Sequence, residues 1–62
     1  MNYEPGSLGF HEFVDRSYLI AQLFEDALAE HPAAKHPALQ KKVTRIEKAL
    51  YALYQEAARL HL

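Results

Sequence analysis

The sequence predicts an all-α fold, an antiparallel two-helix hairpin whose copies associate into a helical bundle. Two stretches carry apolar side chains at alternating steps of four and three residues. This spacing returns the side chains to one helix face, because each residue turns a helix by about 100°. A short polar segment with two prolines joins the two stretches. Half of the 62 residues are apolar, more than two helices can bury against each other, so we expect homo-oligomerisation.

Length and composition restrict the class of protein. A chain of 62 residues forms at most one domain. It contains no cysteine, which removes disulfides, thiolate metal sites and thiol nucleophiles and indicates a reducing compartment. No apolar run approaches the roughly 20 residues that span a bilayer, and the first residues do not resemble a signal peptide. We therefore predict a cytoplasmic protein with no membrane partner. The net charge of -1 makes DNA an unexpected partner.

The first predicted elements are a flexible N-terminal arm over residues 1–9 and a helix over residues 10–30. The arm contains Pro5, Gly6 and Gly9 and shows no period. Ser7 or Gly9 is the expected helix cap. The apolar arc of this helix is wider than one neighbouring helix covers, which favours a second interface. Its predicted seam consists of Phe10, Val14, Ser17, Ala21, Phe24, Leu28 and His31.

The connection is predicted over residues 31–36 and the second helix over residues 37–60. Pro32 disfavours α geometry in the residue before it, so the first helix should end near Glu30. Pro37 suits the first position of a helix. We interpret the repeated His-Pro-Ala as two successive helix starts. The predicted seam of the second helix consists of Leu39, Val43, Ile46, Leu50, Leu53, Ala57 and Leu60.

An antiparallel hairpin brings distant side chains together. The acidic residues of 25–30 should lie beside the basic residues of 35–45 and attract them. His11 should approach His61 at the open end, and His31 should lie near His36 at the turn. No third ligand stands at a metal-site spacing, so we predict no metal and no cofactor. Neither serine lies in a nucleophile elbow and there is no glycine-rich phosphate loop, so no catalytic residue is predicted and the chain is not expected to be an enzyme.

Basic residues concentrate over residues 35–48, and tyrosines lie nearby. Cations bind phosphate and aromatic rings stack on bases, so this group suits a nucleotide or RNA at a subunit junction. A solvated helix face with tyrosines at the edge of the core is the competing interpretation. The candidate ligand-binding residues are Arg16, Tyr18, Lys42, Arg45, Tyr51 and Tyr54.

Three segments resemble short, phage-encoded helical-hairpin proteins: Asp15-Arg16-Ser17-Tyr18-Leu19-Ile20, Glu30-His31-Pro32 and Leu53-Tyr54-Gln55-Glu56. Hairpins of this size include the anti-CBASS and anti-Thoeris sponges, which sequester cyclic nucleotide signals of bacterial immunity. The resemblance is one of pattern and length, and no functional residue is transferred by it. It implies a homo-oligomer in the cytoplasm of the phage's host. The hairpin is also similar to the plasmid repressor-of-primer protein, an RNA-binding four-helix bundle.

The sequence therefore leaves three hypotheses. The first is a non-enzymatic oligomeric binding protein, a phage counter-defence sponge that holds a cyclic nucleotide at subunit interfaces. The alternative is a structural or regulatory interaction module that docks on a host protein. The third is an RNA-binding four-helix bundle.

Overall fold

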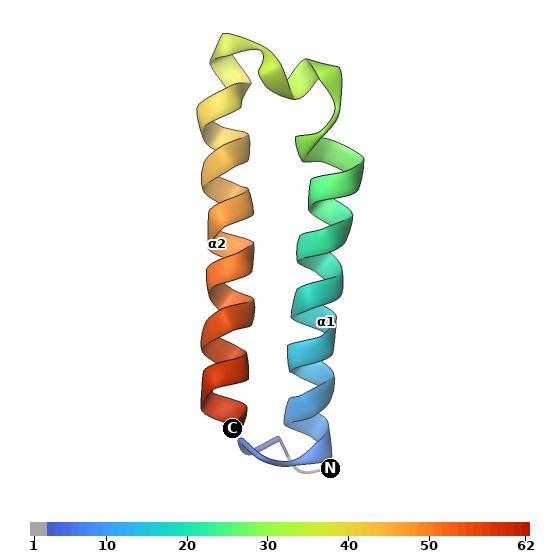
Figure 1. Ribbon diagram of the computed structural model, residues 1–62, viewed down its shortest axis with the longest axis vertical. Coiled ribbons are helices and arrows are strands. Elements are labelled where there is room, and N and C mark those ends of the chain that lie inside the picture. Colours follow the sequence, from blue (N-terminus) through green and yellow to red (C-terminus); the bar gives the residue numbers. More distant parts are fainter. Residues whose placement is uncertain (1–2) are drawn as a thin grey trace.

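The computed structural model describes residues 3–62, which form a rod of about 43 × 16 × 15 Å. Two long helices, α1 (Leu8–Phe24) and α2 (Pro37–His61), lie side by side and antiparallel (Figure 1). Between them stand a π-helical turn, η1 (Glu25–Ala29), and a 3-10 turn, η2 (Pro32–Lys35). Residues 3–62 contain no strand. The predicted all-α hairpin is confirmed.

The first helix begins at Leu8, two residues before the predicted start, because Ser7 is its cap. The Ser7 hydroxyl accepts a hydrogen bond from the amide of Phe10, which satisfies one of the free amides at the helix start. Gly6 adopts φ +90° and its amide donates to Nδ1 of His61 at 3.0 Å. The arm is thereby tied to the end of α2. Residues 1 and 2 of the predicted flexible arm lie outside the described residues, and the flexibility of the remainder stays a prediction.

The last turn of the first helix is wider than an α-helix. The amide of Glu30 donates to the carbonyl of Glu25 at 3.0 Å, an i to i+5 bond that defines a π-helical turn. The chain stays helical up to Ala29, with Glu30 as the cap, so the helix predicted over residues 10–30 ends close to where it was expected, but its last turn has π geometry. This turn rotates the residues after it relative to α1.

The two histidines of the connection are helix caps. Nδ1 of His31 accepts from the amide of Ala33, and Nδ1 of His36 accepts from the amide of Ala38, both at 3.0 Å. A proline follows each histidine as the first helical residue, where its missing amide costs nothing. The interpretation of His-Pro-Ala as two helix starts is confirmed. The imidazole rings were not predicted as caps, and each completes one helix start.

Small side chains form the contact between the helices. Ala21 is fully buried, and Ser17 and Ala57 are also buried. The Ser17 hydroxyl donates to the carbonyl of Val14 at 2.8 Å, so its burial leaves no unpaired group. Among residues 3–62, no large side chain is fully buried. The hairpin therefore has a thin core.

The predicted seam of α2 divides into two rows. Val43, Leu50 and Ala57 form an inner row with Ala57 buried and the others half-buried. A second set recurs every seven residues, and each member is 47% exposed. We call it the leucine row: Leu39, Ile46, Leu53 and Leu60. The prediction of one seam packed against α1 is thus only half right, because one neighbouring helix covers one row and leaves the other half open.

The expected attraction between the acidic and basic ends of the hairpin produces no ion pair. Within residues 3–62, the carboxylate–cation contacts closer than 4.0 Å join His11 to Asp15, Arg16 to Glu12 and Arg59 to Glu56. Each pair lies within a single helix near the open end, the first two in α1 and the third in α2. Within residues 3–62, the basic residues over 35–48 therefore have no carboxylate partner.

Candidate binding surfaces

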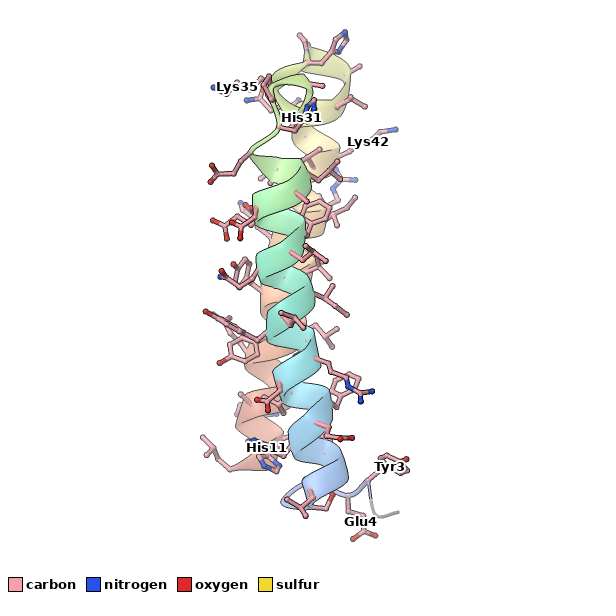
Figure 2. All side chains as sticks on the ribbon, turned by 90° about the vertical axis from the view of Figure 1, so that its right-hand side faces the viewer. Tyr3, Glu4, His11, His31, Lys35 and Lys42 are labelled. Atoms are coloured by element: carbon pink, nitrogen blue, oxygen red, sulfur yellow. The ribbon has the colours of Figure 1, made fainter. Side chains whose placement is uncertain are left out.

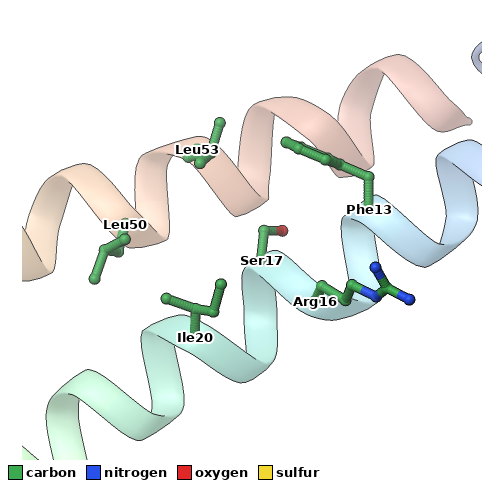
Figure 3. A pocket seen from close by; sticks show the side chains of 6 residues that line it. All are labelled: Phe13, Arg16, Ser17, Ile20, Leu50 and Leu53. Carbon is green, nitrogen blue, oxygen red and sulfur yellow. The ribbon is translucent and has the colours of Figure 1, made fainter.

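A mostly apolar groove runs along one side of the hairpin (Figure 3). It has a volume of about 260 Å³ and is lined by Phe13, Arg16, Ser17 and Ile20 from α1 and by Leu50 and Leu53 from α2. This volume lies below the roughly 300–1,000 Å³ of ordinary small-molecule sites. Phe13 and Ile20 are 49% and 54% exposed. The groove side therefore suits an apolar side chain of a macromolecule better than an enclosed ligand.

Arg16 is the charged residue of this groove. Its Nη2 lies 3.9 Å from Oε2 of Glu12, and both side chains are largely exposed. Such a pair contributes only about 0–1 kcal/mol, so Arg16 stays available for an anion. The candidate Tyr18 stands two residues later and points to a different face, because residues at i and i+2 of a helix do not face each other.

The opposite side of the hairpin holds the candidate tyrosines, and we call it the tyrosine side. The rings of Tyr18 and Tyr54 lie 5.0 Å apart at an angle of 54°, a favourable tilted arrangement. The Tyr51 hydroxyl donates to Oε2 of Glu25 at 2.5 Å and accepts from Nε2 of Gln22 at 2.9 Å. The Tyr51 hydroxyl is thereby bonded to a carboxylate, whose negative charge disfavours a phosphate beside it.

The hydrogen bond to Glu25, with partial burial and the charge of that carboxylate, raises the pKa of Tyr51 to about 12. The folded chain therefore holds a proton between pH 10 and 12 that the unfolded chain releases. By linkage, this stabilisation is complete below pH 10 and is lost as the pH rises through 12. We expect the urea midpoint of the wild type to fall more steeply over this range than that of Tyr51→Phe. If the urea midpoints of the two proteins fell equally steeply with pH, the raised pKa of Tyr51 would be contradicted. Lysine titration cannot cause a difference, because both proteins contain the same lysines.

The candidate cations separate into two groups. Arg45 lies on the outer face of α2 with Lys41 and Lys48, because steps of four and three residues share a helix face. We call these three residues the basic row. All three are exposed, and within residues 3–62 none has a carboxylate within 4.0 Å. Lys42 belongs to a neighbouring row, and Figure 2 shows it and Lys35 on opposite sides of the turn end.

The six candidate residues thus do not form one site within the single chain. Tyr18 contacts Tyr54, Tyr51 is bonded to Glu25, and Arg16 lies in the groove. Lys41 and Lys48, which were not among the candidates, accompany Arg45. Their spacing of four and three residues was the available signal.

Histidines and rings gather at the open end of the rod, where Figure 2 shows His11. The ring of His61 stacks on Phe10 at 5.6 Å and lies 5.4 Å from that of His11, which confirms the expected approach of the two histidines. Nε2 of His11 is 3.3 Å from Asp15. Residues 3–62 nevertheless hold no group of three side chains placed to bind a metal ion.

No helix in residues 3–62 has both the length and the apolar character that crossing a membrane requires. Comparisons with protein-family models, with curated proteins and with solved structures find no match for this chain. The resemblance to phage hairpin proteins therefore stays a prediction.

Proposed function

We propose that this chain is a non-enzymatic binding protein that works as a homo-oligomeric helical bundle and captures an anionic nucleotide. The observation that carries this proposal is the basic row of α2, three exposed cations on one helix face with no carboxylate of residues 3–62 within 4.0 Å. Phosphate oxygens are the complementary ligands for such a group.

The helix itself favours an anion at this place. Like charges at i, i+3 and i, i+4 destabilise a helix by about 0.2–0.5 kcal/mol a pair. Lys41 with Arg45, and Arg45 with Lys48, are two such pairs. A phosphate bound between them removes this repulsion and adds charge-assisted hydrogen bonds. The basic row therefore gains stability when a nucleotide binds.

The surface area of the protomer supports a homo-oligomer. The chain of 7.1 kDa exposes 5000 Å², whereas a folded monomer of this mass exposes about 4,100 Å². The surplus is about 900 Å², close to the roughly 800 Å² that each partner contributes to a standard interface. A second copy would cover this surplus.

In the cell, such a protein would act by sequestration. A homo-oligomer that presents several basic rows lowers the free concentration of a nucleotide signal without changing it chemically. This is the mode of action of a phage counter-defence sponge, and we propose a cyclic nucleotide of bacterial immunity as the ligand. The test requires both a ligand panel and a variant of the basic row.

Thermal unfolding should reveal the ligand. A ligand at 100 times its Kd stabilises the folded state by about 2.7 kcal/mol, which raises the Tm of a domain this small by on the order of 10 °C. We expect this shift with a cyclic dinucleotide or a cyclic ADP-ribose isomer, and its loss in Arg45→Gln. Arg59→Gln is the matched control, because Arg59 is already bonded to Glu56 and stands at the other end of α2.

Two results would contradict the nucleotide proposal. A panel in which no nucleotide moves the Tm would remove it. If the protein instead bound RNA with an affinity that falls steeply as salt rises, RNA binding would be its function.

The leucine row favours a second candidate function, an interaction module that docks on a different protein. Its four half-exposed side chains could pack against an amphipathic helix of a different protein as well as against a second copy of this chain. This candidate predicts a chain that stays monomeric at micromolar concentration and binds no nucleotide. Mass measurement of the purified protein separates it from the homo-oligomer.

A further inference from the structure

We infer that the leucine row of α2 packs against the same row of a second copy running antiparallel, with the two α2 helices crossing at Ala49. This inference rests on the proposed homo-oligomer and deepens it by assigning the interface and the direction of the partner. The product is a four-helix bundle in which each α2 lies beside the partner's α2.

The exposure pattern points to a missing neighbouring helix. A helix in a four-helix bundle buries one row of apolar side chains against each of two neighbours. In α2 the inner row meets α1, while the leucine row is uniformly 47% exposed along four heptad positions. Phe13 and Ile20, one heptad apart, are about equally exposed on α1. Both helices therefore present a half-covered row on the groove side.

A second copy fits the amount of surface that needs covering. The surplus of about 900 Å² is close in size to one partner's share of a standard interface, roughly 800 Å². In a two-fold interface both copies contribute the same patch. An isologous contact also needs a patch that complements itself. An apolar row with heptad spacing meets this condition, because such rows interdigitate with copies of themselves.

A third row of α2 indicates the direction of the partner. Lys42, Ala49 and Glu56 are spaced by seven residues and all are exposed. Each lies three or four positions from members of the leucine row, on the side away from the inner row. We call this the flanking row; its ends carry opposite charges and its centre is a small residue.

The flanking row complements itself only in the antiparallel direction. Lys42 and Glu56 each stand about 10.5 Å from Ala49 along the helix axis, from the rise of 1.5 Å per residue. A two-fold axis at Ala49 therefore places Lys42 opposite the partner's Glu56, twice per dimer. Lys42 has no carboxylate within 4.0 Å in residues 3–62, and Glu56 is held only by the exposed Arg59.

The parallel arrangement is less favourable on charge. A two-fold axis along the rod brings both turn ends together, and each carries unpaired basic side chains over residues 35–48. It also sets the two α2 helices on the diagonal of the bundle, where their flanking rows do not meet. Like charges that face each other across an interface oppose association.

Cysteine cross-linking tests the inference, because the chain has no cysteine of its own. In Ala49→Cys the two new thiols face each other across the two-fold axis, within the reach of a disulfide. We expect most of this variant to become a covalent dimer in a glutathione redox buffer. Thr44→Cys is the matched control, since it is also exposed on α2 but points about 140° away. It should stay uncross-linked.

Charge reversal gives an independent readout. Lys42→Glu should weaken the dimer in dilution experiments by several-fold, and adding Glu56→Lys should restore it. Two results would overturn the antiparallel interface and leave the proposed function standing. In both, the protein is an oligomer by mass, but Ala49→Cys either forms no cross-link or cross-links no better than Thr44→Cys. A chain that is monomeric at all concentrations would overturn both.

Discussion

Leu53→Asp is expected to unfold or dissociate the protein, whereas Leu19→Asp should leave it close to the wild type. Leu53 is 47% exposed in the protomer and belongs to the leucine row, so a partner copy would bury the remainder. Losing a buried leucine costs about 1.5–3 kcal/mol, and a carboxylate placed in that interface costs more. We therefore expect the free energy of unfolding to fall by more than about 2 kcal/mol.

Leu19→Asp is the matched control for Leu53→Asp. It is 64% exposed and stands outside the predicted seam of its helix. The two variants share the chemistry of the replacement and its cost in helix propensity, so their difference reports burial by a partner. Urea unfolding at several protein concentrations measures both the free energy and its dependence on association. Equal losses at the two positions would argue that the leucine row faces water.

Ala21→Leu is expected to destabilise the hairpin itself. Ala21 is fully buried where α1 meets α2, and a leucine adds three carbon atoms to a contact made of small side chains. Overpacking of this kind typically costs about 1–3 kcal/mol. Since a protein of this size has little stability to lose, we expect a large fall in Tm.

Ala52→Leu serves as the control for Ala21→Leu. Ala52 is exposed on α2 and the substitution is the same, so the change in helix propensity is matched. Thermal unfolding followed by circular dichroism compares them. If Ala21→Leu lowered the Tm no more than Ala52→Leu, the helices would have to separate enough to accept the leucine.

The fold could be predicted from local rules, because its signals are local. Steps of four and three residues predicted two amphipathic helices, and Pro32 and Pro37 marked the break between them. With so short a connection, the two helices had to run antiparallel. The approach of His11 to His61 followed from that direction alone.

The candidate site was predicted less well. Arg16, Tyr18, Tyr51 and Tyr54 were predicted to act together because of their chemical types. The structure places the arginine in the groove and the three tyrosines on the tyrosine side. Spacing along one helix would have separated Arg16 from Tyr18. It could not have shown that Tyr51 is bonded to Glu25, since the two residues stand 26 positions apart in the sequence, on either side of the turn.

By itself, the sequence determined that this chain forms two helices, where they are interrupted, and that they carry more apolar surface than one hairpin covers. Only the tertiary structure decided which row of α2 faces α1. The physical reason is that periodicity defines a face about 100° wide or more, whereas the rotation of a helix within that face depends on side chains of its neighbour. Here the small contacts at Ala21 and Ala57 set that rotation, and they leave the leucine row half exposed.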